Sequence, residues 1–361
     1  MRVIAYYLPQ FHPIPENDEW WGKGFTEWTS VRHARPLFRG HQQPVEPGEL
    51  GYYNLLDASV RERQAQLAQE AGIEGFCYWH YWFNGKQLLE KPLQMVLESG
   101  KPDFPFCIGW ANESWKAKTW IDHQDAPDKM LIEQTYPEGD DERHFAAILP
   151  LLRDKRYIQV DGKPLLMVYR PLQLPDGKSW TAHWQQMAHD AGLEGLYLLG
   201  HALYSKEVDD VLQLGFDAVN LVPLGDTKRN PWLALRHGWT LIRHLCGKSP
   251  LAYDYKAAIK VFASTIMRRE DVVPTIFPNW DHTPRSKMKG FLLNGATPQL
   301  FRAHAEAIRD IVNGKENQLV MLKSWNEWGE GNYIEPDLRW GRAFLDELNG
   351  AVCECSKEGA V

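Results

Sequence analysis

Short apolar segments that recur along the chain constrain its fold more than any other feature. Eight of them are bounded by turn-forming residues, and most are followed by a segment with helical periodicity. Unbroken apolar runs of this length are typical of parallel strands that are covered on both faces. Helix signals agree with this division, because Pro298 suits a first helical turn and Gly72 and Gly192 suit positions just after a helix.

The expected strands are residues 3–8, 75–82, 106–111, 164–169, 196–201, 218–222, 273–278 and 319–325. The expected helices are residues 58–71, 88–99, 141–154, 181–191, 206–214, 256–269, 298–312 and 340–348. Eight strands that alternate with eight helices predict an α/β fold, a single (β/α)8 TIM barrel with long loops at the carboxyl ends of its strands. A doubly wound open sheet is the alternative, but no glycine-rich dinucleotide-binding motif follows any predicted strand.

The chain is long enough for two domains, but a barrel with long connections also uses 361 residues. We expect the barrel to occupy residues 1–350 and residues 351–361 to form a loosely ordered tail. Two connections, residues 9–54 and 225–269, are longer than a simple barrel needs. Long connections without evident structure tend to be functional.

Charge and cysteine content exclude several classes of protein. A net charge of −7 leaves no overall basic field for a nucleic acid. Five scattered cysteines are expected to be reduced thiols, namely Cys77, Cys107, Cys246, Cys353 and Cys355. The first residues lack a signal-peptide core, and no apolar run is long enough to span a membrane. We therefore expect a cytoplasmic protein.

The second long connection is basic, with nine Lys or Arg and two acids between residues 225 and 269. It contains the amphipathic stretch WLALRHGWTLIRHL. Two interpretations stay open. The stretch is either a helical excursion packed on the barrel with its basic face in water, or a surface helix through which residues 228–269 contact an anionic membrane peripherally.

Polar and aromatic side chains gather where the predicted strands end, which is where barrel active sites form. With residues from the long loops and the last predicted strand, they give the candidate substrate-binding set: Tyr6, Tyr7, Trp28, His80, Tyr81, Asn112, Glu113, Trp115, Tyr169, His201, Asn279, Trp280, Asp281, Asn326, Trp328 and Glu335. For Glu113 the alternative is a structural acid paired with Arg170 or Lys116. Glu335 is more typical of a loop anchor than of a catalyst.

Glu327 and Glu330 are the candidate catalytic residues. In a helical turn, residues three apart share one face, with Cβ atoms about 5–6 Å apart. Two carboxyls that close favour retaining over inverting glycoside chemistry, and mutual repulsion in a dry cleft would separate their pKa values. The alternatives are a solvated acid pair, or carboxylates that suit a helix N-terminus.

Tryptophan is abundant, with 16 in the chain. Flat aromatic faces match the C–H faces of sugar rings, although a tryptophan is also simply a large core residue. The core interpretation is better for Trp79, Trp82 and Trp180, whereas Trp20, Trp21, Trp28, Trp115 and Trp280 suit both interpretations equally.

Other chemistries find no support in the sequence. The histidines His12, His41, His80 and His201 do not fall at metal-ligand spacings, so we expect no metal. No G-x-S-x-G motif, Walker motif or Asp-x-Asp occurs. We therefore expect no cofactor.

Five blocks carry a specific resemblance: YYLPQFHPIPENDEWWGKGFTEWTSV, GFCYWHYWFNG, GWANESW, NWDHTPR and SWNEWGEGNYIEP. They resemble the WbsX-like family, described as glycosyltransferases of surface-polysaccharide biosynthesis and classed with glycoside hydrolase family 99-like domains. The resemblance runs from residue 5 to about residue 348 and implies a (β/α)8 barrel.

In the related endo-α-mannosidases and mannanases the acids lie in a Glu-Trp-His-Glu motif, and the matching stretch here runs from Glu327 through Trp328 and Gly329 to Glu330. The resemblance implies that Glu327 is the base that deprotonates a sugar 2-hydroxyl to give a 1,2-anhydro sugar. It implies that Glu330 is the acid/base, with net retention. Gly329 stands where those hydrolases have histidine, a difference that bears on the substrate more than on the acids.

Three functions are compatible with these features. The first is a retaining endo-glycosidase that acts on an α-linked glycan. The second is a glycosyltransferase that builds an O-antigen or capsule from an activated or lipid-linked sugar. The third is a non-catalytic glycan-binding barrel. In each, the partner is an oligosaccharide or polysaccharide, and the second function allows it to be lipid-linked.

Overall fold

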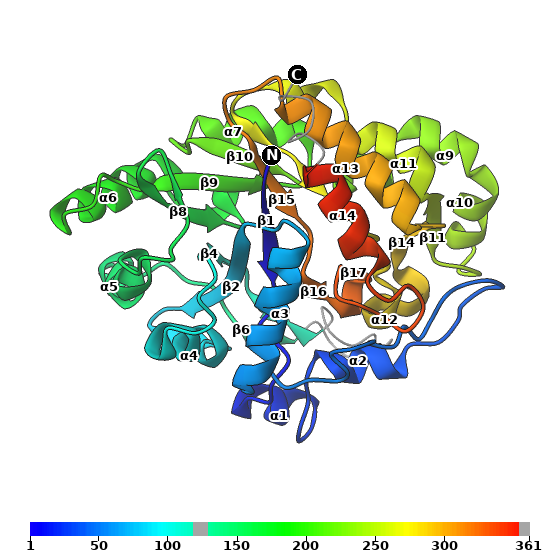
Figure 1. Cartoon of the computed structure of the whole chain (residues 1–361), viewed down its shortest axis with the longest axis horizontal. Coiled ribbons are helices and arrows are strands. Elements are labelled where there is room, and N and C mark those ends of the chain that lie inside the picture. The colour runs from blue at the N-terminus through cyan, green and yellow to red at the C-terminus, as the bar shows by residue number, and fades with distance from the viewer. Residues whose placement is uncertain (118–128, 354–361) are drawn as a thin grey trace.

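The computed structural model describes residues 1–117 and 129–353. Within them, parallel strands form a closed ring surrounded by helices (Figure 1). In spatial order the ring strands are β12 (Val272–Val273), β10 (Ala218–Leu221), β9 (Tyr197–Ala202), β8 (Lys163–Val168), β4 (Phe106–Trp110), β2 (Gly75–Phe83), β1 (Arg2–Tyr7), β15 (Leu319–Leu322) and β13 (Thr275–Ile276). The predicted (β/α)8 barrel is confirmed.

The ring closes at its seventh strand, which Pro274 divides into two short pieces. β12 pairs with β10, with Val272 opposite Val219, and β13 pairs with β15, with Thr275 opposite Met321. Proline cannot donate to a ladder, but its carbonyl still accepts the Met321 N–H at 2.9 Å. The prediction of one continuous strand over residues 273–278 was therefore wrong in detail, although the strand occupies its expected place.

The helices around the ring follow the predicted segments. They are α3 (Ala58–Glu70), α4 (Lys91–Ser99), α5 (Asp140–Leu152), α6 (Gly177–Asp190), α7 (Val208–Leu212), α11 (Tyr255–Phe262), α13 (Pro298–Val312) and α14 (Ala343–Cys353). The expected helix over residues 256–269 ends early and is followed by a 3-10 turn, Thr265–Arg268. Gly72 and Gly192 have φ angles of +77° and +79°, as their expected positions after helices require.

Short elements lie at the carboxyl ends of the strands. They are the helices α1 (Pro15–Trp21), α2 (Glu27–His33) and α12 (Thr283–Ser286), and the strands β3 (Lys86–Leu88), β5 (Trp115–Lys116), β6 (Met130–Ile132), β16 (Asn326–Glu327) and β17 (Asn332–Tyr333). A further short strand, β7 (Gln159–Val160), pairs with the amino end of β8. α1 and α2 come from the first long connection, residues 9–54, and so give it structure that its sequence did not reveal.

The second long connection forms a layered excursion at one side of the barrel (Figure 1). It contains α8 (Leu224–Arg229), α9 (Pro231–Arg236), α10 (Gly238–Leu245) and β11 (Leu251–Asp254), and β11 pairs in parallel with β14 (Phe291–Asn294). A second hydrophobic cluster lies under it, centred on Leu233, Tyr253 and Phe262. The inner side of this stretch thus packs on the barrel, and the two interpretations differ in what its outer side contacts.

Two remaining expectations concern the termini and the membrane. α14 extends to Cys353, so residues 351–353 are helical, while the rest of the expected tail and Cys355 lie outside the described residues. Among the described cysteines, Cys77 and Cys107 are buried free thiols. Within residues 1–117 and 129–353, no helix is long and apolar enough to cross a membrane.

Candidate active site

A cavity of about 510 Å³ opens at the carboxyl ends of the barrel strands. Residues that follow β4, β9, β13 and β15 contribute to its wall, together with α8 and α12. Eight of the predicted site residues line it: Tyr81, Glu113, Trp115, Tyr169, His201, Trp280, Glu327 and Glu330. The cavity therefore brings residues from distant parts of the sequence to one place.

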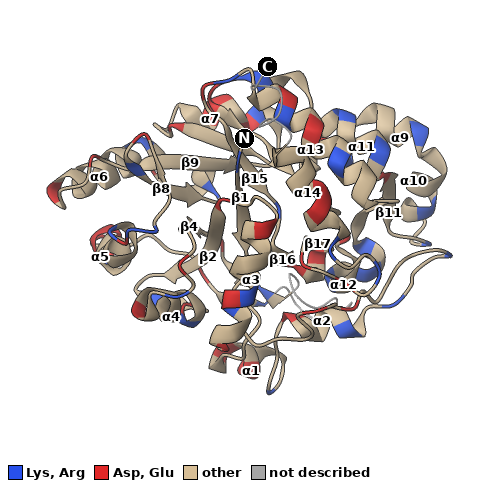
Figure 2. Ribbon diagram, in the orientation of Figure 1, with Lys and Arg blue, Asp and Glu red and all other residues tan. Residues whose placement is uncertain are grey.

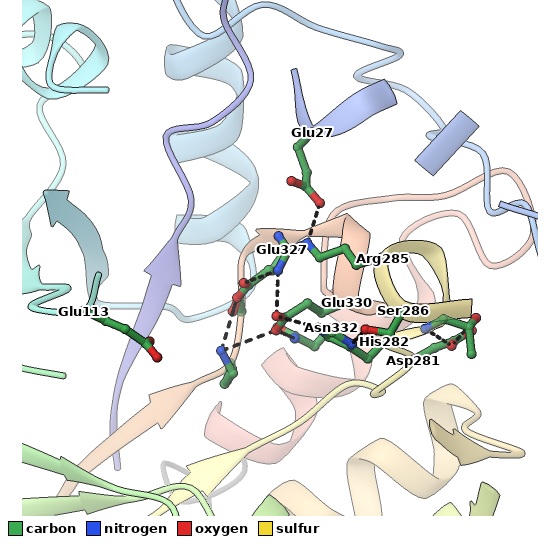
Figure 3. A network of polar contacts seen from close by, with 12 residues as sticks. Glu27, Glu113, Asp281, His282, Arg285, Ser286, Glu327, Glu330 and Asn332 are labelled. Atoms are coloured by element: carbon green, nitrogen blue, oxygen red, sulfur yellow. Dashed lines mark hydrogen bonds and ion pairs between the residues drawn. The ribbon is translucent and has the colours of Figure 1, made fainter. Parts of the chain in front are cut away.

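The two predicted acids lie together in this cavity (Figure 3). Glu327 precedes a 3-10 turn, Trp328–Glu330, that ends at the second acid. Residues three apart in such a turn are nearly eclipsed, so both carboxyls point the same way. They share two cations, because Lys323 Nζ lies 3.2 Å from Glu327 Oε2 and 3.9 Å from Glu330 Oε2, while Arg285 Nη1 lies 3.6 Å and 2.6 Å from their Oε1 atoms.

A third acid holds Arg285 from behind. The Arg285 Nε donates to Glu27 Oε1 at 2.9 Å, and the Glu27 side chain at the start of α2 is completely buried. A Cβ on Gly329 would lie 1.7 Å from the same Glu27 oxygen and 3.0 Å from Arg285 Nε. Glycine between the two acids is therefore what allows Glu27 to reach Arg285, and a histidine there would displace Glu27.

The surrounding charges give the two carboxyls different proton affinities. Burial raises the pKa of Glu327, and repulsion from Glu330 adds to the effect, although Lys323 and Arg285 oppose it. Burial would also raise the pKa of Glu330, but the Arg285 guanidinium, a hydrogen bond from His282 and the Lys323 ammonium outweigh it and hold that pKa well below the usual range. An unequal carboxyl pair of this kind is what acid–base catalysis requires.

Aromatic side chains form much of the remaining wall. Tyr81 packs edge-on against Trp115, and Trp280 stacks over His282 with their rings 6.1 Å apart. Trp79, interpreted from the sequence as a core residue, stacks on Tyr6 but also lines the cavity. Such flat apolar faces beside carboxylates are suited to sugar rings.

Glu113 lies across the cavity from the acid pair (Figure 3). Its carboxylate is 3.3 Å from Arg170 Nη2, so the pairing with Arg170 that the sequence suggested is present. The side chain is still partly exposed and lines the cavity. Pairing and access to a ligand are therefore compatible in this acid.

Ten predicted residues do not line the cavity: Tyr6, Tyr7, Trp28, His80, Asn112, Asn279, Asp281, Asn326, Trp328 and Glu335. Strand alternation explains two of them. The Tyr7 hydroxyl donates to Gln64 on α3, and His80 Nε2 lies 2.9 Å from His144 Nε2 on α5. Both side chains thus point out of the barrel, and burial lowers the pKa of His80 to about 4.

Several of the ten support the site from within the protein. The Tyr6 hydroxyl donates to Asn220 inside the barrel, and the Asn112 amide donates to the Arg170 carbonyl. Asn326 holds the Leu8 backbone, accepting its N–H at 2.7 Å and donating to its carbonyl at 3.0 Å. The polar groups of these residues are thus paired within the protein.

Glu335 forms the centre of a buried network beneath the acid pair. It accepts hydrogen bonds from the Tyr53 hydroxyl at 2.8 Å, Gln64 Nε2 at 2.6 Å and Trp328 Nε1 at 2.6 Å. Trp28 joins the same network through the Tyr53 carbonyl. Burial nevertheless raises the pKa of Glu335 to about 7. The structure thus gives Glu335 the contacts of an anchor for the acid-bearing turn.

Asn279 and Asp281 face a second cavity, of about 430 Å³, on the other side of this turn. Asp281 accepts hydrogen bonds from His41, Gln43 and Thr283, and its N–H donates to the Glu330 carbonyl at 2.6 Å. The backbone of Asp281 thus holds the Glu330 carbonyl, while its carboxylate is bound to His41, Gln43 and Thr283. Trp20 and Trp21 do not line the first cavity; Trp20 packs behind the cavity residue Trp115, and Trp21 packs on Phe25.

Sequence reasoning did not predict four charged or titratable residues around the acids: Glu27, His282, Arg285 and Lys323. Three of them lie in blocks that were already notable, FTEW and NWDHTPR. Lys323 left a further signal, because it is a charged residue near the end of an apolar run, LVMLKSW. A charge placed in such a run indicates a buried partner.

Comparisons with known proteins identify a family and a fold for the chain. The sequence profile of the family described as Glycosyltransferase WbsX matches residues 3–348. The protein WxcX of Xanthomonas campestris pv. campestris strain B100, itself uncharacterised, is 36% identical over 355 residues, which are 97% of this chain and 49% of that protein. WxcX of strain ATCC 33913 matches to the same extent. The chain thus spans about half the length of the curated relatives it matches.

Among solved structures, a glycoside hydrolase-like protein superposes with a TM-score of 0.60 at 16% identity, covering 97% of this chain and 93% of that one. The GH99 endo-α-mannosidase from Bacteroides thetaiotaomicron superposes with a TM-score of 0.59 at 14% identity, covering 100% and 99%. At these identities the similarity shows a common fold.

Proposed function

Because the chain belongs to the WbsX glycosyltransferase family, and because its fold is that of glycoside hydrolases, we propose that it is a carbohydrate-active enzyme that acts on an α-linked glycan through Glu327 and Glu330. One observation carries the proposal. Two acids with unequal pKa values face one aromatic cavity and share Arg285 and Lys323.

The reaction proposed is retaining and uses both carboxyls. One carboxylate takes the proton of the sugar 2-hydroxyl, whose oxygen attacks the anomeric carbon, while the other carboxyl donates a proton to the departing oxygen. The resulting 1,2-anhydro sugar is opened at the anomeric carbon by water, whose proton passes to the second carboxyl as the first returns its own to O2. Two inversions give net retention, and each acid ends in its starting state.

Two arguments disagree on which acid is which. The resemblance to family 99 makes Glu327 the base and Glu330 the acid. The charges around the pair favour the reverse in the unliganded site, because Arg285 keeps Glu330 ionised while burial favours a proton on Glu327. A substrate with an activated aryl leaving group distinguishes the two assignments, since its departure needs no acid in the first step. This substrate should restore turnover to the Gln variant of whichever residue is the acid, and the Gln variant of the base should stay inactive.

A second candidate function is glycosyl transfer in the assembly of a surface polysaccharide. Lys228 and Lys289 line the same cavity as Arg285 and Lys323. Such a set of cations suits a donor that carries phosphate, either a nucleotide sugar or a lipid-linked sugar. In this case an acceptor hydroxyl takes the position of water in the second step.

The experiment combines both reactions in one assay. The full chain is incubated with α-mannan and with bacterial surface-polysaccharide fractions, with and without nucleotide sugars, and products are followed by mass spectrometry and by NMR of the anomeric proton. Release of a fragment with the α configuration supports hydrolysis, and extension of the glycan supports transfer. Binding without turnover, equal in wild type and in the Glu327→Gln/Glu330→Gln double variant, would reject catalysis and favour a glycan-binding barrel.

A further inference from the structure

The two consecutive helices α9 and α10 present apolar side chains to solvent. We call this surface the α9–α10 face and define it by Trp232, Leu235, Trp239, Ile242 and Leu245. Leu235, Trp239 and Leu245 are 83%, 71% and 76% exposed. These five are more than half of the nine exposed large hydrophobic residues in the described part of the chain, so they form a patch rather than a scatter.

The patch is not an unfinished part of the core. The inner side of the excursion already packs, since Leu233 is fully buried and Leu241 contacts the second hydrophobic cluster. α10 has no completely buried residue, and its outward side carries Trp239 and Ile242, three residues apart on one face. The apolar side therefore points away from the protein and needs an external partner.

Basic residues surround the face. Arg236, Arg243 and Lys248 are exposed beside it, and the Arg236 guanidinium and the Lys260 ammonium lie 5.6 Å and 5.9 Å from the centre of the Trp232 ring. Figure 2 shows the Lys and Arg bands on α9, α10 and α11.

The nearby acids are too few to offset this charge. Between residues 225 and 269 the acids are Asp226, bound to Ser205, and Asp254, which caps α11, against nine Lys or Arg. Local positive charge on a chain whose net charge is −7 points to an anionic partner. A second copy docked face to face would instead bring these basic residues against each other.

From this geometry we infer that the α9–α10 face docks on the surface of an anionic phospholipid membrane. Tryptophan and branched apolar side chains enter the interface between headgroups and acyl chains, while Arg and Lys stay at the phosphates. The depth is that of a peripheral contact, because α10 has only eight residues.

Docking of the α9–α10 face would fix the orientation of the first cavity relative to the membrane. The excursion that carries the face also contributes to the cavity wall through Leu224 and Lys228 on α8, and Phe291 on β14 lines it too. β14 pairs with β11, against which α10 packs. A membrane at the α9–α10 face would lie beside the excursion that walls the cavity, where a glycan on a lipid carrier could enter. That last consequence rests on the proposed function, whereas docking itself does not.

The test is co-sedimentation of the full chain with phosphatidylcholine vesicles, with and without added phosphatidylglycerol. We expect binding only to the anionic vesicles, weakened by salt, because each basic residue near such a surface strengthens binding about fivefold. Trp239→Ser/Ile242→Ser and Arg236→Gln/Arg243→Gln should each lose at least about tenfold in vesicle affinity. Leu338→Ser, which removes an exposed leucine elsewhere, is the matched control and should bind as wild type.

Each outcome of this experiment either supports or overturns docking of the α9–α10 face on a membrane. The substituted side chains are exposed, so unchanged thermal unfolding would show that the variants are folded. Absence of vesicle binding by the wild type, or binding that the face variants retain, overturns the proposal. Lipid-free dimerisation that Trp239→Ser/Ile242→Ser abolishes would identify the face as a contact between copies and also overturn it. Failure of the proposed function is distinguishable, because it appears as lack of turnover on soluble glycans while vesicle binding persists.

Discussion

Replacing Gly329 by alanine adds one methyl group at the most crowded point of the site. The new Cβ would lie 1.7 Å from Glu27 Oε1 and 2.9 Å from Glu27 Cδ, so the Glu27 carboxylate must move. Glu27 is fully buried, and moving it breaks the 2.9 Å bond to Arg285 Nε. Overpacking a core costs about 1–3 kcal/mol. We expect about 3 kcal/mol here, because breaking a buried ion pair adds to the steric cost.

The assay for Gly329→Ala is chemical unfolding together with the rate of glycan turnover. Turnover should fall because Arg285, released by Glu27, no longer holds Glu330 in its ionised form. Gly238→Ala is the matched control, since a Cβ at Gly238 would meet nothing within 4 Å and alanine suits a helix start. That variant should unfold at the same denaturant concentration as wild type or at a slightly higher one.

A double-mutant cycle tests whether the clash with Glu27 is the cause. Glu27→Ala removes the clashing atoms, so Gly329→Ala should cost much less in the Glu27→Ala background than in wild type. The reasoning is refuted if Gly329→Ala leaves unfolding and turnover unchanged, or if the two substitutions are simply additive.

Three further predictions concern the charges around the acids. In Arg285→Gln the pKa of Glu330 should rise, so the acid limb of the kcat/KM profile should move to higher pH. In Lys323→Met the pKa of Glu327 should rise, so the alkaline limb of the profile should move to higher pH instead. A kcat/KM profile without limbs would contradict the predictions for both variants. The pKa of Glu335 is raised from 4.5 to about 7, so its stabilising effect is full below pH 4.5 and is lost as pH rises through 7. Between these pH values the unfolding free energy of the wild type should fall by up to about 3 kcal/mol more than that of Glu335→Gln. Equal pH slopes for the two proteins would contradict this.

The sequence predicted the barrel well because its strands are buried on both faces and therefore read as apolar runs. β2, with nine consecutive buried residues, is the clearest example. The break at Pro274 was missed because apolar composition continues across it. The excursion with α8 to α10 was recognised as unusual, but the pairing of β11 with β14 depends on contacts between segments 40 residues apart, which periodicity does not report.

Position after a strand predicted which residues lie at the first cavity, as with Glu327 and Glu330, which both line it. Position alone did not tell which side of a strand a residue faces, so Tyr7 and His80 were included although they point outward. Arg285 and Glu27 were missed for a different reason. They come from separate loops, and only their mutual contact behind Gly329 gives either a role in the site.

The central claim is that Glu327 and Glu330 are the reacting pair, and turnover of single Gln variants tests it most directly. On a glycan that the wild-type chain converts, Glu327→Gln and Glu330→Gln should each lose about 10²–10⁴-fold in kcat/KM, the range for a general acid or base. Glu62→Gln, on the exposed side of α3, is the matched control and should be fully active. If either site variant turns over the glycan as fast as Glu62→Gln, the pair is not the catalytic pair.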